Sequence, residues 1–122
     1  MINRARKNAI KMDLHPPQVT FLHGYLTDPF PTDIAESSVD CVISNCVLNL
    51  VPSAQKALIL KEVFRVLKPG GRIALDDIVA KKDFPNAIRD SIAAYVGCIS
   101  GAVEQRVYEG YLKDAGFLGS SY

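Results

Sequence analysis

Two hydrophobic patterns alternate along the chain, and together they predict its secondary structure. Apolar residues at helical spacing predict helices over residues 2–12, 53–67, 85–99 and 104–115. Short and nearly continuous apolar runs predict strands at Val19–His23, Val39–Asn45 and Arg72–Asp77. Buried strands that alternate with amphipathic helices are typical of a mainly parallel sheet with right-handed crossovers and flanking helices. The pattern therefore predicts an α/β fold.

Turn residues define the boundaries of the central helix. Ser53 follows a proline and is a credible N-cap for this helix. Its apolar stripe consists of Leu60, Val63, Phe64 and Leu67. The Lys-Pro-Gly-Gly sequence at 68–71 ends the helix, because proline cannot continue it and glycine accepts a left-handed turn. The stretch 27–38 contains two prolines and is predicted to be a loop.

Composition and charge narrow the class of protein. The chain has 122 residues, of which 48% are hydrophobic and 22% charged, so we expect a single ordinary globular domain over residues 1–122. The net charge is +1 without a long basic run, which argues against a nucleic-acid partner. No apolar stretch approaches the ~20 residues that span a bilayer, and the amino terminus does not resemble a signal peptide. We therefore expect a cytoplasmic protein that does not bind membranes.

The three cysteines are expected to be free thiols, because an odd number without a secretory signal does not suggest a disulfide framework. Cys46 directly follows the strand 39–45, and ligands of parallel sheets bind outside the carboxyl ends of the strands. It is either a ligand or a small buried residue. Cys98 lies within an apolar helical stripe, so it is either a ligand or a packing residue. Cys41 points to the opposite face of the strand and is predicted to lie in the core.

Other polar residues admit a structural explanation. Asp76 and Asp77 end a predicted strand, where one is expected to be solvated and the other bonded to loop amides. A role of this acid pair in a site is the alternative. His23 lacks a second histidine or cysteine at metal-ligand spacing, so it is not predicted to bind a metal. The tyrosines of the last two helices are predicted to lie in the core or in an interface.

Several motifs resemble known families. The segments 38–44, 62–71 and 114–117 resemble the S-adenosylmethionine-dependent methyltransferases of the Rossmann-like class. Within that class, the segments 44–50 (Ser-Asn-Cys-Val-Leu-Asn-Leu) and 96–102 (Val-Gly-Cys-Ile-Ser-Gly-Ala) resemble the arsenite methyltransferases. The resemblance covers nearly the whole chain. It implies that Cys46 and Cys98 bind trivalent arsenic, and that Tyr25, Leu26 and Asn45 border a partial site for S-adenosylmethionine.

Chemistry agrees with the role that this resemblance implies. Trivalent arsenic is soft, and thiolate ligands select soft centres. The two cysteines are 52 positions apart (98 minus 46), so only a fold that joins a strand end to a helix end brings them together. Bound arsenic could then attack the methyl group of the cofactor with its own lone pair, and proximity would be the main catalytic contribution.

The chain also departs from this family. The family usually has two glycines after the second cysteine, whereas Ser100 and Gly101 stand here. Its first two strands, its glycine-rich cofactor loop and the acidic residue after the second strand would all precede Met1. The resemblance therefore predicts a domain truncated at its amino terminus, with weak cofactor binding and little turnover. The gap that this truncation leaves in the sheet predicts that the sheet closes up locally or that chains self-associate by pairing or swapping elements at the exposed edges. Two alternatives remain: a non-catalytic remnant that binds soft ions or a partner chain, and a methyltransferase for another small-molecule acceptor.

Overall fold

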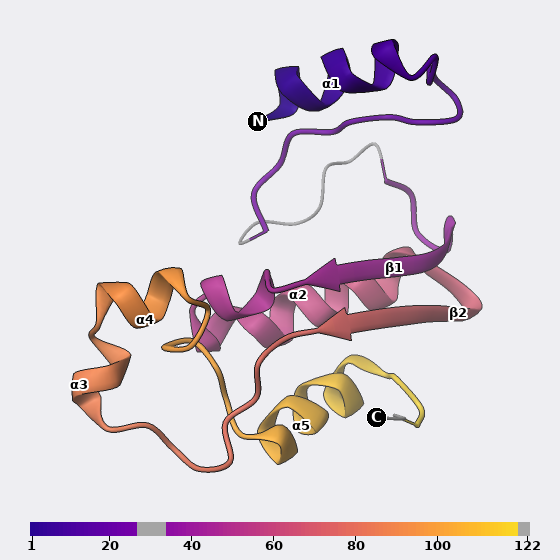
Figure 1. The fold of residues 1–122 in the computed structure, drawn as a ribbon. Coiled ribbons are helices and arrows are strands. Elements are labelled where there is room, and N and C mark those ends of the chain that lie inside the picture. Colours follow the sequence, from indigo (N-terminus) through magenta and orange to yellow (C-terminus); the bar gives the residue numbers. More distant parts are fainter. Residues whose placement is uncertain (27–33, 120–122) are drawn as a thin grey trace.

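The computed structural model describes residues 1–26 and 34–119. Its elements are, in order, α1 (Ile2–Lys11), β1 (Val39–Asn45), the 3₁₀-helix η1 (Leu48–Leu50), α2 (Ser53–Val66), β2 (Leu67–Asp76), α3 (Asn86–Arg89), α4 (Ile92–Val96) and α5 (Gln105–Ala115). The two strands run parallel in a two-stranded sheet (Figure 1). This arrangement confirms the predicted α/β fold. None of the described helices is long and apolar enough to cross a membrane.

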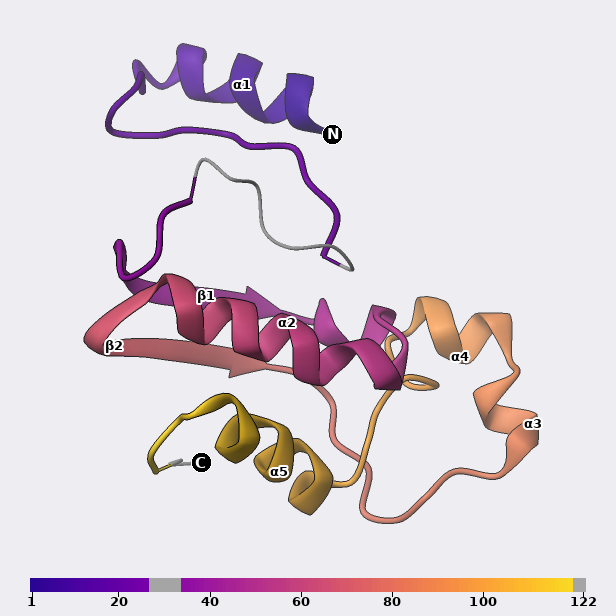
Figure 2. The ribbon, with the colours of Figure 1, turned by 180° about the vertical axis from the view of Figure 1, so that it is seen from behind.

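The sheet is covered on one face. The central helix α2 connects β1 to β2 and lies across the face that Figure 2 shows in front, and α5 packs against α2. No described element covers the opposite face, which is turned toward the viewer in Figure 1. Ile43 of β1 points to this open face and keeps 79% of its surface exposed. Only one face of the sheet therefore contributes to the core.

The core forms where α2 meets the covered face of the sheet and α5. Leu60 is completely buried, and Val63 and Leu67 from the predicted apolar stripe are buried beside it. Phe64, the fourth member of the stripe, lies at the rim instead, where its ring packs edge-on against Phe117 at a centroid distance of 5.2 Å. Helical periodicity thus identified the correct face of α2.

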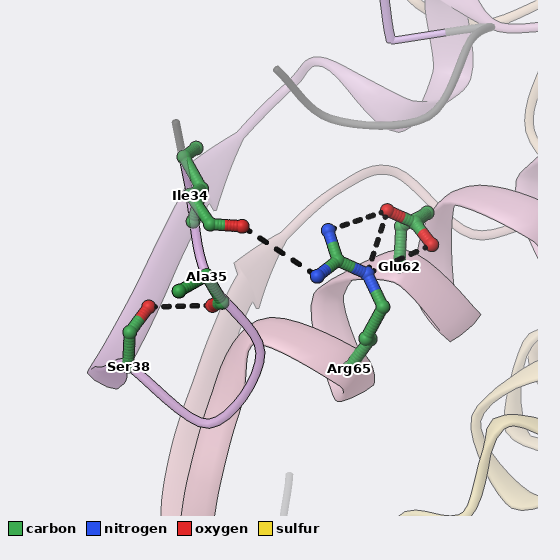
Figure 3. Close-up of polar contacts among 5 residues, drawn as sticks. All are labelled: Ile34, Ala35, Ser38, Glu62 and Arg65. Carbon is green, nitrogen blue, oxygen red and sulfur yellow. Dashed lines mark hydrogen bonds and ion pairs between the residues drawn. The ribbon is translucent and has the colours of Figure 1, made fainter. Parts of the chain in front are cut away.

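The entry into β1 is fixed to the end of α2. The Arg65 guanidinium binds both carboxylate oxygens of Glu62 and donates to the carbonyl of Ile34 at 3.5 Å (Figure 3). The backbone N–H of Ser37 donates to the carbonyl of Arg65 at 2.9 Å. These contacts hold the turn before β1 beside the residue at which β2 begins, so the two strands start in parallel.

The boundaries of α2 differ from the prediction at both ends. Pro52 is the N-cap and Ser53 is the first helical residue, without a side-chain cap, so the prediction of Ser53 as N-cap is wrong. The helix ends at Val66 because Leu67 adopts extended angles (φ −71°, ψ 136°). The strand β2 begins there, earlier than predicted, and includes the turn-like segment 68–71.

The prediction of a strand at Val19–His23 is wrong. This segment has no strand partner among the described residues and forms no regular structure. It is linked to α1 by the Arg6 guanidinium, which donates to the carbonyl of Phe21 at 3.0 Å. An extended apolar run becomes a strand only when it pairs with a neighbouring edge, and this segment pairs with neither β1 nor β2. Of the predicted loop 27–38, residues 27–33 lie outside the described residues.

The predicted helix over residues 85–99 is divided into the short helices α3 and α4. Ser91 separates them, because its hydroxyl accepts a hydrogen bond from the Ala94 N–H at 3.3 Å and so caps α4. The apolar stripe expected here is largely exposed, most of all at Ile92 and Val96. These two helices therefore contribute little to the core; α3 contacts α4, and α4 contacts η1.

Candidate functional site at the strand ends

Cys46 lies directly beyond the carboxyl end of β1. Its backbone N–H donates to the carbonyl of Asp76 at 2.8 Å, which extends the pairing of the two strands by one residue. Its backbone is left-handed, with φ at 53°, a conformation that few residues other than glycine adopt. The chain therefore turns sharply at Cys46 and leaves its side chain exposed at the carboxyl edge of the sheet.

Cys98 reaches the same place from the other end of the chain. It follows α4, and its thiol donates to the carbonyl oxygen of Cys46 at 3.3 Å. Its backbone is also left-handed, with φ at 59°. Strained residues of this kind cluster at functional sites, where surrounding structure holds them in place. The fold thus brings together two cysteines that are 52 positions apart.

The loop that carries Cys98 docks onto η1. The Tyr95 hydroxyl donates to the carbonyl of Leu50 at 2.8 Å. A Cβ atom on Gly101 would lie 1.9 Å from the carbonyl oxygen of Asn49, so only glycine allows the two backbones to approach this closely. The glycine that remains of the expected pair therefore has a structural role: it lets the loop lie against the turn after Cys46.

Local electrostatics favour the protonated thiol of Cys46. Partial desolvation raises its pKa, and the neighbouring Cys98, Asp76 and Asp77 raise it further in that order, because nearby negative charge disfavours a thiolate. A hydrogen bond between the two cysteine side chains acts in the same direction. At neutral pH the strand ends therefore present Cys46 as a neutral thiol.

A buried polar layer lies beneath the cysteines. Asn49 and Lys56 are each only 1% exposed, and the Lys56 ammonium donates to the carbonyl of Leu48. Asp77 accepts from the Asn49 backbone N–H and, at 3.5 Å, from the Tyr108 hydroxyl. Desolvation raises the pKa of Asp77 and lowers that of Lys56. The hydrogen bond between Asn49 and Asp77 thus links the turn after Cys46 to the end of β2.

Asp76 is exposed and Asp77 is bonded to a loop amide, as the structural interpretation of this acid pair predicts, and both carboxylates also lie near enough to Cys46 to raise its pKa. Sequence reasoning missed Asn49 and Lys56. A signal for Lys56 existed, because it precedes Leu60 by four residues and Val63 by seven and so shares the apolar face of α2. Asn49 lies between two leucines in sequence, but no helical or strand periodicity there indicated which of these side chains would be buried.

The prediction that Cys41 lies in the core is wrong. Cys41 is exposed because it belongs to the open face of the sheet, together with Ile43. It stands opposite Arg72 of β2, several residues before the carboxyl edge where Cys46 lies. The chain therefore contains a third free thiol, which lies within β1 and not beyond its carboxyl end.

The residues expected to border a cofactor are less well assembled. Tyr25 is 71% exposed and its ring contacts only that of His23, at a centroid distance of 6.1 Å, among the described aromatic residues. Leu26 is also exposed, and Asn45 stands opposite Asp76 at the end of β1. Within residues 1–26 and 34–119, no hydrogen bond, ion pair or ring contact joins Tyr25 or Leu26 to Asn45. These residues do not enclose a site that fits S-adenosylmethionine.

A cavity among the described residues lies away from the cysteines. It has a volume of about 1080 Å³ and follows β2, α5 and the end of α2, with Leu75, Tyr108 and Phe117 in its lining. Neither Cys46 nor Cys98 lines it. The thiol pair is therefore a surface site.

Comparison with known proteins identifies the family. The Methyltransferase domain family matches residues 1–116. Arsenite methyltransferase from Halobacterium salinarum is 37% identical over 117 residues, which are 96% of this chain and 28% of that protein. The mouse (Mus musculus) arsenite methyltransferase is 41% identical over 93 residues, which are 76% of this chain and 24% of that protein.

A solved structure agrees with these relatives. The crystal structure of CrArsM, an arsenic(III) S-adenosylmethionine methyltransferase from Chlamydomonas reinhardtii, superposes with a TM-score of 0.73 and 30% sequence identity. The match covers 88% of this chain and 35% of that chain. The chain thus spans about a quarter to a third of the length of the relatives that it matches. It belongs to the methyltransferase domain family, and its relatives there are arsenite methyltransferases.

Proposed function

We propose that this chain binds trivalent arsenic between Cys46 and Cys98, as the acceptor of an S-adenosylmethionine-dependent methyl transfer. The observation that carries the proposal is the contact of the Cys98 thiol with the Cys46 carbonyl at 3.3 Å. Two adjacent thiols, here the exposed Cys46 and the half-buried Cys98, can chelate one soft centre. Similarity to arsenite methyltransferases supports the choice of arsenic over other soft ions.

The binding step is an exchange of ligands without oxidation. Arsenous acid, As(OH)₃, forms two As–S bonds with two thiols, two As–O bonds break, and two water molecules leave. The proton of each thiol goes to a departing hydroxide, so neutral thiols are suitable reactants. The raised pKa of Cys46 is compatible with this step for that reason. Arsenic keeps its third hydroxide and its lone pair.

The methyl donor would have to be held by other groups. Tyr25, Leu26 and Asn45 are the residues that resemblance assigns to this role, yet in the described residues they form no enclosed surface. We therefore expect the chain by itself to bind arsenic, to bind S-adenosylmethionine weakly, and to turn over slowly. The exchange of arsenic ligands depends only on the thiols.

Arsenite titration with counting of free thiols tests this proposal. Cys46→Ser and Cys98→Ser should each weaken arsenite binding by roughly a hundredfold or more, because a chelate becomes a single bond. Cys41→Ser is the matched control, since Cys41 is an exposed thiol within β1, five positions before Cys46. Arsenite binding that depends on Cys41 as much as on Cys46 or Cys98 would contradict the proposal.

A second candidate is a protein that binds soft ions without methyl transfer, which the exposed Tyr25 and Leu26 favour. Incubation with arsenite and a methyl-labelled donor separates the two candidates. Label in arsenic supports transfer, whereas stoichiometric binding without labelled product supports the second candidate. A small organic acceptor is the third possibility, and in that case Cys46→Ser would leave methyl transfer intact.

We also propose self-association through β1. Its outer edge has no partner strand among the described residues, and Ile43 exposes an apolar side chain beside it. Such edges and patches favour pairing with a second chain. Sedimentation at increasing concentration should show dimers or larger species, and a monomer throughout would contradict this expectation. A reducing compartment such as the cytoplasm suits the three free thiols.

A further inference from the structure

Asn49 occupies a central position between the two cysteine-bearing segments. It lies in η1, three residues after Cys46, and is 1% exposed. Its side-chain amide donates to the carbonyl of Ile78 at 2.7 Å, in the segment that follows β2. Its backbone N–H donates to the carboxylate of Asp77. Asn49 thereby fixes the turn after Cys46 to the end of the second strand.

The same residue forms the surface on which the Cys98 loop lies. The backbone of Gly101 approaches so closely that an added Cβ would be 1.9 Å from the Asn49 carbonyl oxygen and 2.9 Å from its carbonyl carbon. Gly101 lies only three positions after Cys98, and Ala102 after it is buried. A shift of Asn49 would therefore move Cys46 and Cys98 relative to one another.

From these contacts we infer that Asn49 is a positioning residue that sets the distance between the thiols of Cys46 and Cys98. Among the described residues no hydrogen bond joins its side chain to either thiol, so it acts through the three segments that it joins. This inference rests on the proposed function in one respect: the ligand that benefits from the fixed distance is trivalent arsenic.

The bonding of Asn49 distinguishes this role from simple core packing. Its side-chain carbonyl oxygen has no hydrogen-bond partner among the described residues although it is buried. An unpaired buried acceptor lowers stability, so an apolar side chain would pack here without that cost. The amide donor to Ile78 is what an apolar residue could not supply.

Two variants of the chain test the inference. Asn49→Leu keeps the number and branching of the side-chain heavy atoms but removes the amide donor, and Gly101→Ala forces the Cys98 loop away from the Asn49 backbone. Phenylarsine oxide is the first probe, because it forms two As–S bonds and releases one water on binding two thiols. Each variant should lower its affinity by roughly tenfold to a hundredfold, since chelation needs both sulfurs in place.

Two further readouts separate positioning from folding. Iodoacetamide reacts with one thiol at a time, so its rate at Cys46 and at Cys98 should change less than about threefold in either variant if the fold is kept. A short bifunctional thiol reagent such as dibromobimane bridges the pair without arsenic, and its bridging rate should fall with the arsenical affinity. The double variant should lose less than the two single losses combined, because both changes displace the same residue, Asn49.

Gly110→Ala is the matched control, because a Cβ added there meets no atom within 4 Å. It should leave bridging and arsenical affinity unchanged. Bridging and affinity that stay within about twofold of the unmodified chain in both Asn49→Leu and Gly101→Ala would overturn the inference. An unmodified chain that is bridged but binds no arsenical would overturn the proposed function and leave the positioning role standing.

Discussion

Val19–His23 and Val39–Asn45 have the same kind of sequence but different structures. Both are short apolar runs, yet only the second forms a strand, β1, because it lies beside β2. The first runs in extended form beside α1, held by the Arg6 hydrogen bond. The comparison teaches that a strand depends on its neighbour as much as on its own residues.

The regions that contain these segments also differ in how many long-range contacts and buried residues stabilise them. In the carboxyl-terminal region, side chains reach backbone groups far away in sequence, as Asn49, Tyr95 and Cys98 do across 29, 45 and 52 positions. In residues 1–26, α1 contains a single buried residue, Ala9, among those described. We therefore expect the two regions to respond very differently to substitution.

The largest contrast should appear in the core. Leu60→Ala removes a completely buried side chain from α2 and should lower the free energy of unfolding by about 2–5 kcal/mol. Ile10→Ala changes an exposed residue of α1 and should alter it by less than about 0.5 kcal/mol. Urea unfolding measures both. Equal losses would show that the amino-terminal helix packs as tightly as α2.

Gly116 offers the next contrast. It ends α5 with φ at 110°, and a Cβ there would lie 2.8 Å from the Phe64 ring. Gly116→Ala should destabilise the protein by about 1–3 kcal/mol through backbone strain and this collision. Gly110→Ala, within the same helix, should be neutral or stabilising by up to about 1 kcal/mol. Thermal unfolding of the two variants tests the assignment, which fails if their order is reversed.

Tyr95→Phe should have a smaller effect. It removes the hydroxyl that donates to Leu50 and should cost about 0.5–1.5 kcal/mol. Because this bond docks the Cys98 loop, alkylation of Cys98 should become faster while that of Cys41 stays the same. Mass mapping after a short exposure to iodoacetamide compares the two rates. Equal acceleration at both cysteines would indicate general loosening instead.

The smallest change concerns the protonation of Cys46. Asp76 is one of the negative groups that raise the pKa of this thiol, after desolvation and Cys98. Removing its charge in Asp76→Asn favours the thiolate, so the pKa of Cys46 should fall and its alkylation should begin at lower pH. Asp13→Asn is the control from the amino-terminal region. An alkylation profile that moves to higher pH would contradict the assigned electrostatics.

The hydrophobic pattern correctly predicted those elements whose packing partners are also among the described residues. The strand β1 and the helix α5 have nearly the predicted bounds, since both pack around α2. Val19–His23 and Cys41 were predicted wrongly because their burial requires elements that the described residues do not supply. Periodicity could not reveal the meeting of Cys46 with Cys98, which depends on where a loop docks. The motif resemblance indicated it, whereas Asn49 became evident only from its contacts.

The most direct test of the account is to map which sulfurs phenylarsine oxide joins. After arsenical binding and alkylation of the remaining thiol, trypsin yields one peptide over residues 12–56 and another over 90–106. The account predicts that arsenic links these two peptides through Cys46 and Cys98 and that Cys41 carries the alkyl group. A bridge from Cys41 to Cys46 within the first peptide, with Cys98 alkylated, would contradict it.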